Sequence, residues 1–118
     1  MKEIFLLLIV TLFATNANCQ TCDDIMEMVR SEDYGETVYS YNSSAISKVS
    51  FHMVWHDYEK SYFAIVCFKN GYTCNEYIYQ VSSMTYSNYI QNYQYSAGKA
   101  FWKYIQPYNY VLGCAPEL

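Results

Sequence analysis

Cysteine and histidine are the residue types in this chain whose spacing could support chemistry. Of its 118 residues, five are cysteines and two are histidines. His52 and His56 are four residues apart, so on an extended strand their side chains face the same side. With Asp57 or Glu59 they could form a metal site or an acid–base pair. The spacing fixes no third ligand, so we expect neither a metal ion nor another cofactor.

Other patterns typical of catalysis are missing from the sequence. It contains no nucleophile elbow, no phosphate-binding loop and no pair of carboxylates at a fixed catalytic spacing. The cysteines are better explained as disulfide partners than as nucleophiles. We therefore expect a protein that is not an enzyme, with a hydrolase using His52 or His56 as the weakest alternative.

Residues 1–19 are typical of a secretory signal peptide. Lys2 supplies a positive charge, and an apolar run of ten residues, Ile4–Phe13, follows it. That run is too short to span a bilayer, so the pattern indicates a segment that is removed. We expect a secreted or periplasmic protein with no membrane anchor after cleavage.

Signal cleavage is compatible with two positions, after Ala17 or after Cys19. The second is preferred because it starts the mature chain at Gln20 and leaves an even number of cysteines for an oxidising compartment. The four that remain are Cys22, Cys67, Cys74 and Cys114. They allow three connectivities. We favour Cys67–Cys74 and Cys22–Cys114, while the alternative pairs each hairpin cysteine with one near a terminus.

Two apolar, aromatic runs flank Asn70-Gly71 within residues 61–79. Asn-Gly between such runs predicts a two-residue type I′ hairpin turn, which places Cys67 directly opposite Cys74. One face of this hairpin is expected to carry Ala64, Val66, Phe68, Tyr77 and Tyr79. The other face is expected to carry Phe63, Ile65, Cys67, Cys74 and Ile78.

The elements around this hairpin follow from periodicity and capping residues. Apolar and polar residues alternate from Ile46 onward, so residues 46–79 are predicted to form a three-stranded antiparallel meander. Ser82 or Ser83 can cap one helix, and Ser96 can cap a second that ends before Pro107. Their inward residues are expected to be Tyr86, Tyr89, Ile90, Tyr93, Ala97, Phe101, Tyr104 and Ile105.

The N-terminal part of the mature chain is predicted to add a helix. Thr21 and Asp24 have the spacing of a capping box. The predicted fold is α+β: a three-stranded antiparallel meander packed against two C-terminal helices, with an added N-terminal helix. The predicted organisation is a signal peptide in residues 1–19, an acidic helix and connector in 20–43, and a domain with a C-terminal tail in 44–118.

Composition argues against nucleic-acid binding. The net charge is −4, with 15% charged residues, and the acids are concentrated between Cys22 and Tyr41, where Arg30 is the single cation. From Ser44 onward the chain is nearly neutral and lacks the clustered Lys and Arg that phosphate binding requires. The fifteen tyrosines suit half-buried strand positions, and they also suit a binding surface.

An ordered set of residues in the second half of the chain resembles the KTSC domain, a small module named for the C-terminus of some lysyl-tRNA synthetases. The matching residues are Ser44-Ala45-Ile46, Val49, Phe51, Phe68-Lys69-Asn70-Gly71, Tyr77-Ile78-Tyr79, Val81, Ser96-Ala97-Gly98-Lys99-Ala100-Phe101 and Ile105. The resemblance covers residues 44 to about 108 and implies a small sheet with helices. RNA binding has been suggested for the family, which has no established activity.

These observations favour a secreted, disulfide-stabilised binding module without catalysis, whose ligand the sequence does not identify. The candidate interaction surface is the second hairpin face with the two histidines: Phe63, Ile65, Ile78, His52 and His56. Either the protein's own N-terminal helix or a protein partner is expected to cover this face. The alternative is a domain that binds RNA or single-stranded nucleic acid through stacked tyrosines, as the resemblance suggests.

Overall fold

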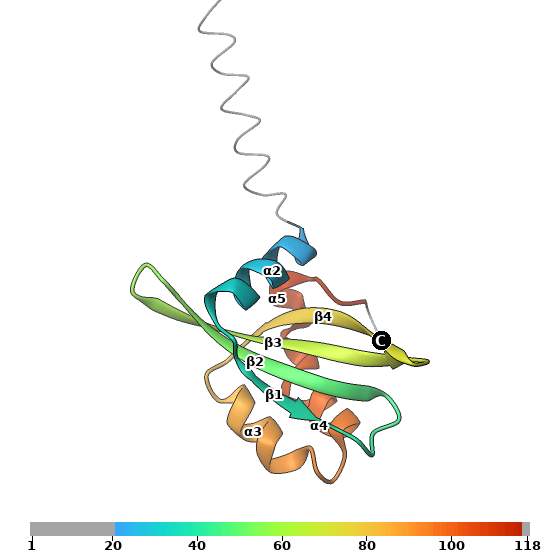
Figure 1. Ribbon diagram of the computed structural model, residues 1–118. Coiled ribbons are helices and arrows are strands. Elements are labelled where there is room, and N and C mark those ends of the chain that lie inside the picture. Colours follow the sequence, from blue (N-terminus) through green and yellow to red (C-terminus); the bar gives the residue numbers. More distant parts are fainter. Residues whose placement is uncertain (1–20, 117–118) are drawn as a thin grey trace, which may run out of the picture.

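A computed structural model describes residues 21–116, which form one antiparallel sheet with helices on both faces (Figure 1). The elements in chain order are α2 (Cys22–Glu32), β1 (Glu36–Tyr39), β2 (Ile46–His56), β3 (Glu59–Asn70), β4 (Thr73–Val81), α3 (Thr85–Asn92), α4 (Ala97–Tyr104), the 3₁₀ helix η1 (Gln106–Tyr108) and α5 (Asn109–Leu112). The expected signal peptide, residues 1–19, lies outside the described residues. Among the described helices, none has the length and apolar character needed to cross a membrane.

The α+β class predicted from the sequence is confirmed, but the sheet has four strands in the order β1-β2-β3-β4 instead of three. The additional strand, β1, pairs with the segment of β2 between Lys48 and Phe51. Val38 is its one buried residue. A strand of four residues with a single buried side chain shows little alternation, so the sequence predicted a polar connector there, with residues 38–41 as a candidate extended segment but not as a strand of the sheet.

The β3–β4 hairpin turns at Gly71 and Tyr72, one residue later than the Asn70-Gly71 pattern predicted. Asn70 pairs with Thr73 across the turn. Gly71 has a φ of 66°, which suits a glycine in the first central position of a type II′ turn. The predicted type I′ turn would need positive φ at both Asn70 and Gly71, whereas here Gly71 is the one turn residue with positive φ.

This later turn shifts the strand register by two residues. Cys67 lies opposite Glu76, so the predicted direct pairing of Cys67 with Cys74 was wrong. Side chains alternate between the two faces of a sheet with a period of two, so a shift of two residues leaves each of them on its predicted face. The two cysteines remain on the same face as diagonal neighbours.

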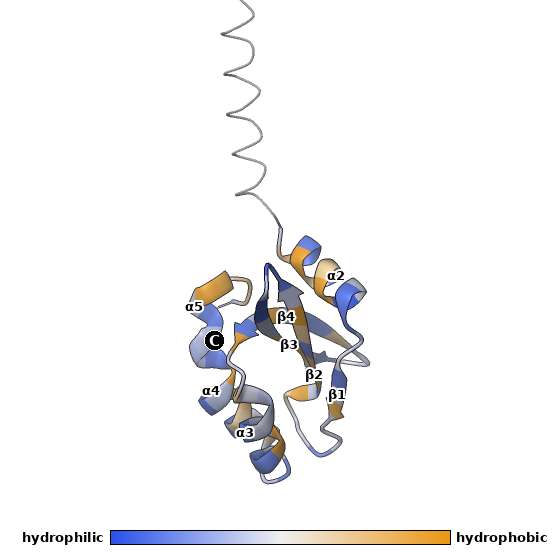
Figure 2. Ribbon diagram, turned by 90° about the vertical axis from the view of Figure 1, so that its left-hand side faces the viewer, coloured by the Kyte–Doolittle hydropathy of each residue, from blue (hydrophilic) through white to orange (hydrophobic). Residues whose placement is uncertain are grey.

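The sheet separates two hydrophobic cores, and Figure 2 shows α2 on one side of it with α3 and α4 on the other. The larger core lies on the α3/α4 face and contains Val38, Ile46, Val49, Phe51, Ala64, Val66, Tyr79, Val81, Tyr89, Ala97, Ala100, Phe101 and Ile105. The smaller core lies on the α2 face and contains Met26, Val29, Val54, Phe63, Ile65 and Ile78.

Helix α2 has the predicted capping box. The Asp24 amide donates to Thr21 Oγ1 at 3.1 Å, and the Thr21 amide donates to Asp24 Oδ2 at 3.4 Å. Met26 and Val29 are its buried residues and pack on the sheet. Arg30 on the adjacent side of the helix forms an ion pair with Glu76 of β4. Because both charged groups are partly exposed, this pair contributes at most about 1 kcal/mol.

The two C-terminal helices occupy their predicted positions, with one difference in capping. Ser96 caps α4 as expected, accepting a hydrogen bond from the Lys99 amide at 3.2 Å. Helix α3 begins after Met84 without a side-chain cap, and Ser82 instead accepts from the Met84 amide. Helix α5, which was not predicted, follows η1 and ends at a left-handed Gly113.

The β2–β3 hairpin extends beyond both layers of helices, at the left of Figure 1. Its turn consists of Asp57 and Tyr58, both with positive φ, as a type I′ turn requires. Met53 and Trp55, on the part of β2 that leads to this turn, are exposed. The apolar alternation that predicted a strand from Ile46 therefore does not lead to burial along its whole length.

Candidate binding cleft

The candidate interaction surface of the sequence analysis is largely buried. Phe63, Ile65 and Ile78 have relative exposures of 6% or less, because Met26 and Val29 of α2 pack over them. Of the two covers that the sequence allowed, the structure contains the protein's own N-terminal helix. These three residues are therefore part of a core, and a partner could reach them only after α2 had moved away.

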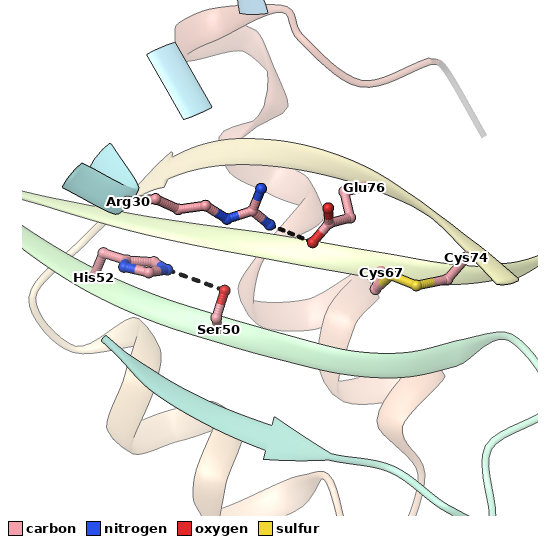
Figure 3. A network of polar contacts seen from close by, with 6 residues as sticks. All are labelled: Arg30, Ser50, His52, Cys67, Cys74 and Glu76. Atoms are coloured by element: carbon pink, nitrogen blue, oxygen red, sulfur yellow. Dashed lines mark hydrogen bonds and ion pairs between the residues drawn. A yellow bond between two sulfur atoms is a disulfide. The ribbon is translucent and has the colours of Figure 1, made fainter. Parts of the chain in front are cut away.

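His52 belongs to a buried polar contact beneath the end of α2. Its Nδ1 lies 2.8 Å from the backbone oxygen of Asp33 and its Nε2 lies 3.0 Å from Ser50 Oγ (Figure 3). A carbonyl oxygen only accepts hydrogen bonds, so Nδ1 is the donor to Asp33, and Nε2 is paired with the Ser50 hydroxyl. Both ring nitrogens are used in joining α2 to the sheet, which indicates a structural role.

The chain passes so close to His52 that a glycine is required at position 35. Gly35 has a φ of 72°, and a Cβ there would lie 2.4 Å from the Phe51 oxygen and 2.6 Å from His52 Nδ1. Just before it, the Asp33 carboxylate accepts from the Met53 amide at 2.9 Å. The short connection from α2 to β1 is thus fixed against the outer edge of β2.

His56 is separated from His52 in environment as well as in sequence. It lies at the exposed turn of the β2–β3 hairpin, with Nε2 3.3 Å from Asp57 Oδ2. Over residues 21–116, no three His, Cys, Asp or Glu side chains are grouped as metal ligands. The structure therefore does not bring the two histidines together into a site.

The four cysteines of the described residues are joined in the two favoured pairs. Cys22 and Cys114 have Cα atoms 5.6 Å apart, and Cys67 and Cys74 have Cα atoms 5.3 Å apart. The first bridge ties the start of α2 to the C-terminal tail. The second links β3 and β4 near their turn (Figure 3). Both spacings are typical of disulfides.

A different feature, an open cleft of about 450 Å³, lies between the β1–β2 loop and the α3–α4 connection. These two segments meet at one corner of the molecule, at the lower right of Figure 1. Its lining residues are Tyr39, Ser40, Tyr41, Asn42, Ser43, Ser44, Ala45, Tyr93, Gln94, Tyr95, Ser96, Ala97 and Gly98. The volume is within the range of about 300–1,000 Å³ that is typical of small-ligand sites. We call this feature the tyrosine cleft.

Aromatic rings dominate the rim of the tyrosine cleft. The rings of Tyr39 and Tyr41 are nearly parallel, with an angle of 11° between their planes and 5.9 Å between their centroids. Tyr41 is 85% exposed and Tyr95 is 91% exposed. Exposed aromatic rings beside a hollow are what a binding surface needs, because they offer apolar area and a polar hydroxyl at little conformational cost.

Hydrogen bonds hold both walls of the cleft in place. In the β1–β2 loop, Ser43 Oγ accepts from the Ile46 amide at 3.0 Å. The backbone oxygen of Ser43 accepts from the Lys69 ammonium. On the other wall, the Tyr95 amide donates to the Asn92 oxygen at 3.2 Å, and Ser96 caps α4. Because both loops are braced in this way, the cleft is largely formed before any ligand arrives.

Two buried hydroxyl groups adjoin the floor of the cleft without a hydrogen bond of normal geometry to any described residue: Ser40 Oγ and the hydroxyl of Tyr89. Burial raises the pKa of Tyr89, and the neighbouring Ser40 hydroxyl opposes that rise only in part. Tyr93, which lines the cleft, stacks on the Tyr89 ring with 5.6 Å between centroids. Unpaired buried hydroxyls are uncommon, so this region retains unused hydrogen-bonding capacity.

The tyrosine cleft differs in charge from two other hollows of the surface. None of its lining residues is Asp, Glu, Lys, Arg or His. The hollow beside α2 includes Asp23, Glu27, Arg30 and Glu76. The hollow near the start of β1 includes Glu36, whose hydrogen bond with the Tyr86 hydroxyl raises the pKa of Tyr86. The cleft is therefore suited to an uncharged ligand.

The tyrosine cleft was not predicted from the sequence. Its two walls are about fifty residues apart in the chain, in segments expected to be a polar connector and the start of a helix. A signal is visible in retrospect, because each wall contains two tyrosines separated by one residue: Tyr39 with Tyr41, and Tyr93 with Tyr95. Tyrosines in otherwise polar loops are a weak sign of binding on their own.

Comparison with protein families, curated proteins and solved structures finds no match to this chain. The site is therefore interpreted from its own geometry and chemistry.

Proposed function

We propose that this protein is a secreted, disulfide-stabilised binding module that acts without catalysis and takes its ligand in the tyrosine cleft. The observation that carries the proposal is the cleft itself: preformed, open, lined by four tyrosines and free of charged side chains. Residues 44–118 are proposed to be a KTSC-like domain because of the ordered set of residues that resembles that family.

The remaining polar groups support a binding role over a catalytic one. The best-formed histidine contact, between His52 and Ser50, is buried beside the α2–β1 connection, where both ring nitrogens already have partners. A catalytic base must reach a substrate proton, and although His52 borders the hollow near the start of β1, it is only 5% exposed and neither ring nitrogen is free. Binding through exposed aromatic rings needs no catalytic base. The tyrosine cleft and the buried His52 therefore both favour binding without catalysis.

The proposed binding site can be tested by mapping ligand contacts on the disulfide-bonded protein. Backbone amide NMR shifts would be followed while adding neutral oligosaccharides, proline-rich peptides and single-stranded oligonucleotides in separate titrations. We expect one of these probes to shift amides in residues 39–45 and 93–98. Replacing both Tyr41 and Tyr95 by alanine should remove those shifts, whereas Tyr58→Ala, at the distant hairpin turn, should leave them. If no probe shifts these two segments, the proposed function is wrong.

Secretion is tested independently by the mass of the exported protein. Expression with its own leader should give a mature chain that begins at Gln20 or its cyclised form and contains no free thiol. Both disulfides would then form in the oxidising compartment. A chain that retains residues 1–19, or that reacts with a thiol reagent without reduction, would contradict this part of the proposal.

A further inference from the structure

We infer that the ligand of the tyrosine cleft is a neutral saccharide chain. This inference rests on the proposed function and narrows it to one ligand class. The juxtaposition that supports it is a set of exposed, partly parallel tyrosine rings beside hydroxyl and amide side chains, in an open cleft with no charged lining residue.

Sugars combine two surfaces that seldom occur together in other ligands. One side of a pyranose ring presents C–H groups, which pack on the negative face of an aromatic ring, and its edge presents hydroxyls that both donate and accept hydrogen bonds. The cleft offers the same combination. Tyr41 and Tyr95 provide exposed rings, and Asn42, Gln94 and Ser96 provide groups that together donate and accept.

The neutral lining favours a sugar over a phosphate-bearing ligand. Three lysines lie near the cleft in the chain or the sheet, Lys48, Lys69 and Lys99, but none of them is a lining residue, and Lys69 already donates to the Ser43 backbone oxygen. Single-stranded nucleic acid also stacks on aromatic rings, but its binding depends on a positively charged groove that follows the backbone. A neutral oligosaccharide can pack on the tyrosine rings without a positively charged groove.

The wall formed by the start of α4 leaves room for a ligand to approach the backbone. A Cβ added at Gly98 would meet only Ser96 Oγ, at 3.9 Å, so packing within the protein does not require glycine there. Replacing Gly98 by alanine should therefore preserve or slightly raise stability, since alanine favours a helix. The same methyl group would narrow the cleft, which makes this variant informative about binding.

The test compares neutral and charged oligomers on the full disulfide-bonded mature chain. Neutral oligomers of glucose, mannose and N-acetylglucosamine would be titrated by calorimetry and NMR, alongside oligogalacturonate and oligo(dT). We expect saturable binding of at least one neutral oligomer, with shifts confined to residues 39–45 and 93–98. Tyr41→Ala and Tyr95→Ala should each weaken it about tenfold. Tyr41→Phe should retain most of the affinity because the ring remains.

Control variants separate loss of the site from loss of the fold. Tyr58→Ala and Tyr72→Ala remove exposed tyrosines at the two hairpin turns and should leave affinity unchanged. Gly98→Ala should weaken binding while the melting temperature stays the same or rises slightly. If oligogalacturonate or oligo(dT) binds the cleft and no neutral sugar does, the saccharide inference is wrong while the binding function stands. If no oligomer or peptide probe shifts the cleft residues, both fail.

Discussion

The face of the sheet that packs against α3 and α4 buries thirteen hydrophobic residues, whereas the face beneath α2 buries six. The cover of the first face contributes large buried rings such as Tyr89 and Phe101. The cover of the second face contributes two buried residues of α2, Met26 and Val29, with Leu112 and Cys114 packed beside them, and the Cys22–Cys114 bridge joins the start of α2 to the tail. The two faces are thus stabilised in different ways.

This difference shows how a small domain can cover both sides of a sheet. A domain of this size buries a limited fraction of its surface, and a helix with two buried side chains gains little from burial alone. Restricting the unfolded chain with a bridge between residues 92 positions apart supplies what packing does not. Packing dominates on one face, and a covalent constraint supports the other.

The largest expected effect comes from removing the bridge on the α2 face. Replacing Cys22 and Cys114 together by serine should lower the free energy of unfolding by about 4–5 kcal/mol, from the lost restriction of a long loop. The matched change at Cys67 and Cys74, which are 7 positions apart, should cost only about 2–3 kcal/mol. Urea denaturation of the three proteins measures both values. Equal losses would show that loop length is not what stabilises the α2 face.

Truncating the centre of the larger core should have the next largest effect. Phe101 is buried and packs edge-to-face on both Phe68 and Tyr79. Phe101→Ala should cost about 4 kcal/mol, because it removes a ring and leaves a cavity. Val29→Ala on the α2 face removes less buried apolar surface, so it should lower the free energy of unfolding by only about 1–2 kcal/mol. If Val29→Ala proved as costly as Phe101→Ala in chemical denaturation, the proposed contrast between the faces would fail.

The smallest effect concerns one hydroxyl of the larger core and depends on pH. Burial, with a smaller contribution from Tyr77, raises the pKa of Tyr79 from 10.0 to about 12, so folding favours the neutral form. The stability linked to this group is present below pH 10 and is lost as the pH rises through 12. Among the described residues, the Tyr79 hydroxyl has no hydrogen-bond partner.

Tyr79→Phe should therefore leave stability near pH 7 unchanged or slightly higher, since it removes an unpaired buried hydroxyl. As the pH rises from 10 to 12, the variant should become more stable than the parent by up to about 2–3 kcal/mol. Denaturation curves between pH 7 and 12 measure the difference, with Tyr110→Phe, at an exposed site, as the control. A pH dependence identical to that of the parent would contradict the role of Tyr79.

Local patterns predicted most of the architecture. The capping box of α2, the Ser96 cap of α4 and the two faces of the central hairpin are all found as expected. The hairpin faces were predicted correctly although the turn was placed one residue early, because an error of two in register preserves alternation. The same error in register did not affect the expected Cys67–Cys74 bridge, because diagonal neighbours on one face of the sheet are also close enough to form a disulfide.

The sequence by itself determined which side of the hairpin strands is apolar, roughly where the main helices lie and that an even set of four cysteines follows Gln20, because these properties depend on neighbours within a few residues or on simple counting. Tertiary structure alone decided that Glu36–Tyr39 joins the sheet, that α2 covers Phe63, Ile65 and Ile78, and that two distant loops enclose a cleft. Each of these depends on segments far apart in the chain being packed together, and no local pattern records which segments will meet.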